Sequence, residues 1–122
     1  MNRVSLTGKV SRYSGLKYTP SGIATLQFTL AVPQSILDTP SVGYFKVEAF
    51  GDSAVELSEV TRVGSEFLVE GSLWNRSYTN RQGFKVFEVK VVAGRVQQPG
   101  SENWFVFEKR SPGEAETHKA SC

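Results

Sequence analysis

The sequence has almost none of the side chains that catalysis and metal binding most often use. Its single cysteine, Cys122, is the last residue, and its single histidine is His118. No GxSxG motif, phosphate-cradling glycine loop or cluster of metal ligands occurs along the chain. We therefore expect a protein that is not an enzyme, with no catalytic residues, no metal and no cofactor. A single cysteine also excludes an intramolecular disulfide.

Long apolar runs, targeting signals and repeats are absent as well. No apolar run approaches the roughly 18 residues that a membrane-spanning helix needs, and residues 1–4 do not resemble the start of a signal peptide. The 122 residues, 39% of them hydrophobic, suit one globular domain. We expect a soluble, cytoplasmic, nucleoid-associated protein that makes no membrane contact. The net charge of +2 is too small by itself to demand a nucleic-acid partner.

Period-two alternation of apolar and polar residues is the main pattern that the sequence does contain. It predicts five strands, and the helical spacing of Ala54 and Leu57 predicts one short helix, capped by Asp52 or Ser53. This order of elements is that of the OB fold. The predicted fold class is therefore all-β, a five-stranded OB-fold barrel with one short helix between strands 3 and 4. The predicted strands cover residues 3–12, 23–32, 44–50, 66–78 and 84–92.

Proline, glycine and polar residues separate the predicted strands. Residues 14–15 and 19–22 predict turns, residues 33–43 predict a loop, and residues 79–83 predict a hairpin turn. We expect the OB-fold domain to span residues 1–98 and a partly flexible C-terminal tail to span residues 99–122. Within that tail, the Trp-Phe-Val-Phe segment at 104–107 is too apolar for an ordinary disordered tail. It could add a strand, pack on the barrel or bind a partner.

Aromatic and basic residues recur on the outward faces of the third and fourth predicted strands. Aromatic rings stack on unpaired bases, and cations follow the sugar-phosphate backbone, so this mixture favours single-stranded nucleic-acid binding. Strand parity directs six side chains outward, namely Tyr44, Lys46, Phe50, Trp74, Arg76 and Tyr78. Further candidate contacts are Lys17, Tyr18, Arg81 and Lys85. Parity directs other side chains to the core, including Phe45, Val47, Ala49, Phe67, Val69, Leu73, Phe87, Val89 and Val91.

The outward aromatics also fit a second interpretation. Barrels are rich in cross-strand aromatic packing, and the same side chains could be buried in an oligomer interface. Glu48 and Glu70 have outward parity too, and their carboxylates would repel phosphate at a DNA-binding face.

Several segments of the sequence resemble the bacterial single-stranded DNA-binding protein family and its relative, primosomal replication protein N. The resemblance covers roughly residues 2–96, and in that family stacking aromatics occupy the positions matched by Tyr44, Phe50 and Tyr78. Ile36 stands where the family often has a tryptophan. The matching segments are residues 2–10, 16–22, 28–32, 45–51, 54–57, 63–65 and 69–73.

The resemblance implies non-enzymatic binding of single-stranded DNA, largely without sequence specificity, in replication, recombination or repair. It also implies self-association, as a homotetramer or, in the primosomal branch, a homodimer. The tail lacks the acidic, phenylalanine-ended tip that recruits partner enzymes in replicative members of the family. The alternative is therefore a module like primosomal replication protein N, in which contacts with replication or repair proteins dominate.

Overall fold

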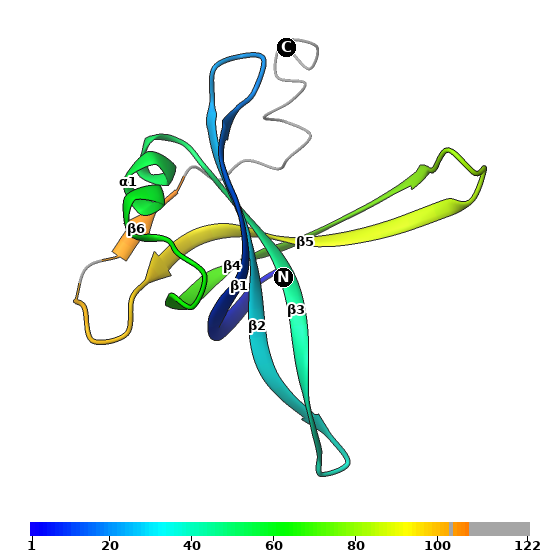
Figure 1. The fold of residues 1–122 in the computed structure, drawn as a ribbon, viewed down its shortest axis with the longest axis horizontal. Coiled ribbons are helices and arrows are strands. Elements are labelled where there is room, and N and C mark those ends of the chain that lie inside the picture. Colours follow the sequence, from blue (N-terminus) through cyan, green and yellow to red (C-terminus); the bar gives the residue numbers. More distant parts are fainter. Residues whose placement is uncertain (103, 108–122) are drawn as a thin grey trace.

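The computed structural model describes residues 1–102 and 104–107, and its strands form one sheet that closes on itself (Figure 1). The sheet order is β3-β2-β1-β4-β5-β6, and a parallel pairing of β3 with β5 closes the barrel. The five-stranded barrel with one helix between β3 and β4 is confirmed. The elements are β1 (Val4–Tyr18), β2 (Ala24–Ile36), β3 (Thr39–Phe50), α1 (Asp52–Val60), β4 (Glu66–Thr79), β5 (Lys85–Gln97) and β6 (Trp104–Val106).

One apolar core fills the barrel, because the inward positions of all five strands carry large side chains. Phe28 and Phe67 meet there edge to face, with ring centroids 5.6 Å apart. Helix α1 covers one end of the barrel and buries Ala54 and Leu57, as its helical spacing predicts. The other large, fully buried core side chains are Leu26, Leu30, Val10, Val47, Val69, Val91 and Val96.

The helix begins without a side-chain cap, so the prediction that Asp52 or Ser53 caps it is wrong. Gly51 is the N-cap residue, with a φ of 104° that favours glycine, and its carbonyl accepts a hydrogen bond from the Ala54 amide. At the other end, the Thr61 hydroxyl donates to the Leu57 carbonyl at 2.7 Å. The chain therefore enters the helix through a backbone turn that only the glycine permits at low cost.

Strand β1 is longer than its alternation predicts, because it does not end at residue 12. Its first half pairs with β4 and its second half with β2, and two register shifts bend it between these partners. The second shift contains Gly15, whose φ is 95°. The turn predicted at residues 14–15 is therefore a bulge within the strand, and the chain reverses only after Tyr18.

The loop predicted at residues 33–43 is also wrong, because β2 and β3 continue into it as a tight hairpin. Leu37 and Asp38 form the turn, with φ values of 49° and 62°. Beyond Ala31, β2 pairs only with β3, so the ribbon has a free edge that tolerates Pro33 and Pro40. The β1–β2, β2–β3 and β4–β5 hairpins project from the barrel in different directions (Figure 1).

The segment at 104–107 adds a strand, which is the first of the three alternatives left open by the sequence. Strand β6 pairs with the end of β5, and the Phe107 amide donates to the Gly94 carbonyl at 2.9 Å. The Phe107 side chain is buried in the main core. His118 and Cys122 lie outside the described residues. Among the described residues, no helix is long and apolar enough to cross a membrane.

We predict that Gly71→Ala destabilises the barrel by roughly 1 to 3 kcal/mol, because β4 and β5 approach too closely there for a methyl group. A Cβ atom at Gly71 would lie 2.0 Å from the Val92 carbonyl oxygen. Gly94→Ala is the matched control, since its nearest neighbour would be 3.5 Å away. Urea unfolding of both variants measures the difference, and equal stabilities would contradict the close approach.

Candidate nucleic-acid interface

Beyond Gly71 β4 pairs only with β5, and β5 pairs with β3 only at Lys90–Val92, so the rest of the β4–β5 hairpin projects from the barrel as a two-stranded ribbon with two differently composed faces. Because side chains alternate along a strand, neighbouring positions point to opposite sides. The Tyr78 face carries Trp74, Arg76, Tyr78, Val86, Glu88 and Lys90, and the Phe87 face carries Leu73, Ser77, Lys85, Phe87 and Val89.

Three of the predicted site residues lie together on the Tyr78 face. Tyr78 is exposed, and the Arg76 guanidinium carbon lies 5.5 Å from the centroid of its ring. Trp74 is half-buried and packs at the base of the ribbon, against a small apolar cluster of Phe50 and Val92. The ribbon thus presents one open ring with a cation beside it, and a second ring nearer the barrel.

Strand β3 places Tyr44 and Lys46 on one side of the strand, two residues apart. Tyr44 is 66% exposed, and Lys46 reaches across to Glu88 on β5, with 3.4 Å between its Nζ and Oε1. The parallel pairing of Lys46 with Lys90 fixes this neighbourhood. The structure therefore brings Lys46 to the barrel end of the Tyr78 face, and Tyr44 lies two residues away along β3, toward the β2–β3 turn.

Phe50 does not join that surface, so the prediction that it stacks on an open face is wrong. Its outward parity is correct, but only 1% of the residue is exposed. Val92 of β5, Trp74 of β4 and Ile23, just before β2, pack against it and form a second, small apolar cluster. Phe50 supports Trp74 from below instead of meeting a base.

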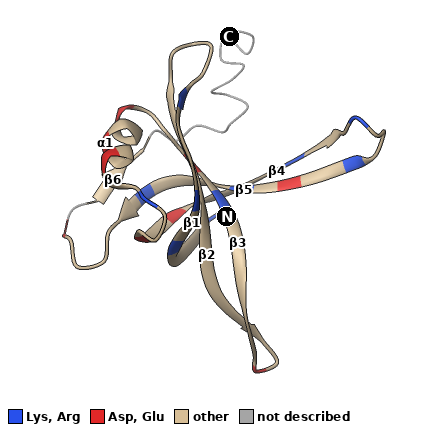
Figure 2. Cartoon of the chain, viewed as in Figure 1, with Lys and Arg blue, Asp and Glu red and all other residues tan. Residues whose placement is uncertain are grey.

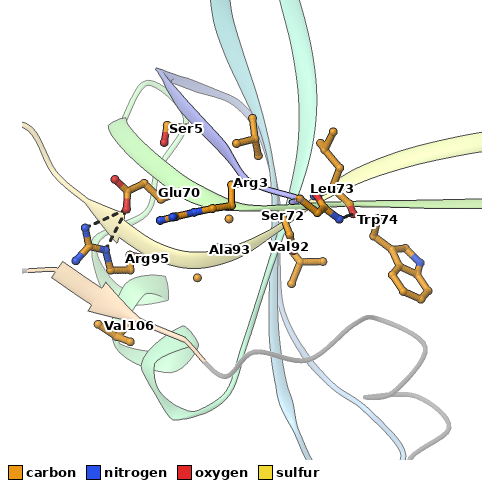
Figure 3. Close-up of a pocket in the computed structure, with 14 residues that line it drawn as sticks. Arg3, Ser5, Glu70, Ser72, Leu73, Trp74, Val92, Ala93, Arg95 and Val106 are labelled. Atoms are coloured by element: carbon orange, nitrogen blue, oxygen red, sulfur yellow. Dashed lines mark hydrogen bonds and ion pairs between the residues drawn. The ribbon is translucent and has the colours of Figure 1, made fainter.

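The two carboxylates that were expected to repel phosphate are both paired. Glu48 is 4% exposed, forms an ion pair with Lys90, and accepts a hydrogen bond from Gln27 Nε2 at 3.4 Å. Glu70 accepts two hydrogen bonds from Arg95, at 3.0 and 3.1 Å, in a hollow of about 1020 Å³ at the barrel end (Figure 3). Neither carboxylate is an open negative charge on the Tyr78 face.

The remaining predicted contacts are dispersed over the projecting hairpins. Lys17 and Tyr18 are exposed where β1 ends, and Arg81 is exposed in the β4–β5 turn. Lys85 lies on the Phe87 face, with its Nζ 5.5 Å from the Phe87 ring centroid. These four residues do not form one site with Tyr78.

The prediction that Leu73, Phe87 and Val89 are core residues is wrong. All three are exposed, although their parity matches that of buried Val69 and Val91. The reason is that Leu73 lies where β4 has lost its pairing with β1, at the edge of the barrel, and that Phe87 and Val89 lie on the projecting ribbon, where β5 no longer pairs with β3. The predicted strand parity is correct, but parity does not indicate where the barrel ends.

Glu88 is the site residue that sequence reasoning missed. It accepts a hydrogen bond from Arg76 Nε at 2.9 Å and also pairs with Lys46, and it lies 3.9 Å from Lys90. Burial alone would raise the pKa of Glu88, but the Arg76 hydrogen bond and the charges of Lys90 and Arg76 lower it below its ordinary value of 4.5. The predicted hairpin turn fixes which residues of the two strands lie opposite each other, and it sets Arg76 opposite Glu88. The Arg76–Glu88 ion pair could therefore have been predicted from the sequence.

A closed β-barrel with exposed aromatic and cationic side chains on a projecting ribbon defines a class of single-strand nucleic-acid-binding proteins. Among the described residues, no group of three His, Cys, Asp or Glu side chains is placed to hold a metal ion. The model of the "Single-strand binding protein family" matches residues 1–99. The chain belongs to this family of non-enzymatic DNA-binding proteins.

Curated relatives support the same membership over most of the chain. The single-stranded DNA-binding protein of Streptococcus pneumoniae serotype 4 is 33% identical over 120 residues, covering 96% of this chain and 72% of that protein. Single-stranded DNA-binding protein 2 of Staphylococcus aureus is 32% identical over 108 residues, covering 84% and 78%. Single-stranded DNA-binding protein A of Bacillus subtilis is 33% identical over 100 residues, covering 80% and 58%.

We predict very unequal losses of stability at two aromatic positions of β3. Phe50→Ala should lower the free energy of unfolding by about 3 to 5 kcal/mol, because it removes a buried ring. Tyr44→Ala should change it by no more than about 0.5 kcal/mol, because that ring is mostly in water. Urea unfolding at neutral pH distinguishes them, and a small loss for Phe50→Ala would mean that its ring is not part of the core.

The Glu88 carboxylate should stabilise the fold only while it is ionised. Because its folded-state pKa is lowered, this contribution is fully present above the ordinary value of 4.5 and is lost as pH falls through the folded value. We expect wild-type stability to fall more steeply on acidification than that of Glu88→Gln, measured by urea unfolding from pH 7 downward. Parallel curves for wild type and Glu88→Gln would contradict the assignment.

Proposed function

We propose that the chain holds single-stranded DNA along the Tyr78 face and the adjoining part of β3. Membership of the single-strand binding protein family makes single-stranded DNA binding, in replication, recombination and repair, the function of the chain. The observation that supports this particular surface is the exposed Tyr78 ring with Arg76 beside it, continuous with Lys46 of β3. Tyr44 and Tyr78 stack on bases, while Lys46 and Arg76 contact phosphates.

Binding on this surface is largely independent of base sequence. Every base has a flat ring system, so stacking on Tyr44, Trp74 or Tyr78 does not select among bases. The cations of the face meet the phosphates, which are the same along any strand. Affinity therefore falls with added salt and changes little between oligonucleotides of different sequence.

The DNA path follows the basic β4–β5 hairpin and reaches β3 at Tyr44, but it does not continue to the tip of the β2–β3 ribbon. Residues 31–43 contain no lysine or arginine and one acid, Asp38, whereas the β4–β5 hairpin carries Arg76 and Arg81. Figure 2 shows the corresponding contrast, with blue positions along the projecting β4–β5 hairpin, whereas the projecting part of β2 and β3 is tan with a red position at its tip. Lys17 and Tyr18 extend the path at the β1–β2 hairpin. The Ile36 position contributes no stacking ring.

A second candidate function, self-association or binding of a replication or repair protein, rests on the Phe87 face. Leu73, Phe87 and Val89 form an exposed apolar strip on the side of the ribbon away from Tyr78. A homodimer or homotetramer assembled through such apolar surface would bring several DNA-binding faces together at high effective concentration. This assembly would operate in the cytoplasm, with residues 1–98 as the DNA-binding domain.

The test is a titration with poly-dT oligonucleotides, followed by intrinsic Trp and Tyr fluorescence at low and high salt. We predict quenching that weakens with salt, and a loss of about 1 to 3 kcal/mol in affinity, about fivefold to 150-fold, for Tyr78→Ala. Trp74→Ala should lose less, because its ring is half-buried. Phe87→Ala is the matched control, an exposed aromatic on the opposite face of the same ribbon.

Two outcomes would contradict this assignment. The first is an absence of oligonucleotide binding at low salt, which would exclude the proposed DNA-binding surface and favour the second candidate function, protein binding through the Phe87 face. The second is a loss of DNA affinity in Phe87→Ala together with normal affinity in Tyr78→Ala. This result would mean either that DNA binds the Phe87 face or that DNA binding requires self-association through that face. Sedimentation of Phe87→Ala would distinguish the two, because only the second predicts a smaller assembly.

A further inference from the structure

Three cations from three different strands converge on one carboxylate at the base of the β4–β5 ribbon. Lys46 comes from β3, Arg76 from β4 and Lys90 from β5, and all approach the carboxylate of Glu88. The distances to its oxygens are 3.4 Å from Lys46 Nζ, 2.9 Å from Arg76 Nε and 3.9 Å from Lys90 Nζ. This arrangement of donors around an oxyanion is the one that a phosphate group also requires.

The carboxylate lies beneath its partners. The side chain of Glu88 is 15% exposed, whereas those of Lys46 and Arg76 are 64% and 49% exposed. Lys90 is held from the other side by Glu48, which is itself buried. Lys46 and Arg76 can therefore turn toward a ligand in solvent, while Glu88, Lys90 and Glu48 stay in place.

A hollow adjoins this cluster on the barrel surface. Its volume is about 230 Å³, and its charged and amide lining consists of Arg12, Gln27, Lys46, Glu48, Glu88 and Lys90. Arg76 does not line the hollow but adjoins it through its hydrogen bond to Glu88. Arg12 thus adds a further cation at the edge of the same depression. The hollow lies beside Lys46, on the surface to which the DNA is assigned above.

We propose that this hollow is a phosphate subsite for single-stranded DNA, and that Glu88 occupies the anion position in the free protein. The proposal rests on the DNA-binding function and the Tyr78 face described above. When DNA binds, a backbone phosphate replaces Glu88 as the ion-pair partner of Lys46 and Arg76. The negative charge of Glu88, which stays in place beneath them, then repels the phosphate. Glu88 thereby weakens DNA binding and flattens its salt dependence, because cations already paired with a carboxylate release fewer counterions.

The direct experiment compares Glu88→Gln with the wild type in poly-dT titrations at several salt concentrations. We expect several-fold tighter binding at low salt, and a slope of log affinity against log salt steeper by about 0.7 for each additional phosphate that the protein neutralises. Glu56→Gln is the matched control, because it changes the net charge equally but lies on helix α1. In an Arg76→Gln background, the improvement from Glu88→Gln should shrink, since one of the cations that the substitution releases is missing.

The pKa of Glu88 provides a second measurement that needs no variant. Nuclear magnetic resonance titration of its carboxyl, with and without an oligo-dT, should show the pKa rising in the complex. DNA withdraws Lys46 and Arg76 and brings negative phosphate near, while Lys90 and Glu48 remain. An unchanged or lower pKa in the complex would overturn the displacement.

The outcomes separate this proposal from the function on which it rests. If the wild type binds oligo-dT and Glu88→Gln binds no more tightly than Glu56→Gln, then Glu88 does not compete with the DNA phosphate. That result would leave the assignment of DNA to the Tyr78 face unaffected. Weaker binding by Glu88→Gln would mean that Glu88 positions Arg76 for DNA, which also overturns it. If neither wild type nor any variant binds oligo-dT, the proposed function and the phosphate subsite fail together.

Discussion

The parallel pairing of β3 with β5 is the contact on which both the barrel and the proposed DNA-binding surface depend. It closes the sheet over a short stretch, where Lys46 lies opposite Lys90 and Glu48 opposite Val92. Two lysines side by side would repel each other, so carboxylates have to accompany them. Glu48 pairs with Lys90 from within the barrel wall, and Glu88 pairs with Lys46 from the ribbon. The closure of the fold and the charge pattern of the site are one arrangement.

Closure also decides which strand segments become surface. The barrel needs only part of each strand, so the remainders of β1 to β5 extend outward as hairpins. A projecting ribbon has no layer above or below it, and both of its faces meet solvent. That is why the same alternation that buries Val69 and Val91 leaves Phe87 exposed. We propose one face of the ribbon for DNA, and the other, with Phe87, presents an exposed apolar surface.

The sequence was sufficient for the order of elements, because period two and helical spacing are local properties. It correctly predicted the helix after β3, the hairpin at residues 79–83, and the outward parity of Tyr44, Arg76 and Tyr78. It was insufficient for the burial of Phe50 and the exposure of Leu73, because these depend on where strands from distant parts of the chain stop covering one another. The bulge beside Gly94 is another non-local feature, and it returns Val96 to the core.

The modest net charge of the chain is compatible with DNA binding because the relevant charges are local and nearly balanced. Lys46, Arg76 and Lys90 face Glu48 and Glu88, so the cluster has an excess of only one positive charge. A site built in this way attracts phosphate weakly at long range, where partial neutralisation and salt screening reduce its field. Base stacking on exposed tyrosines then has to supply a large share of the affinity, and stacking does not depend on sequence. Near-neutral electrostatics and open aromatic rings are therefore complementary requirements for a protein that binds any single strand and can also release it.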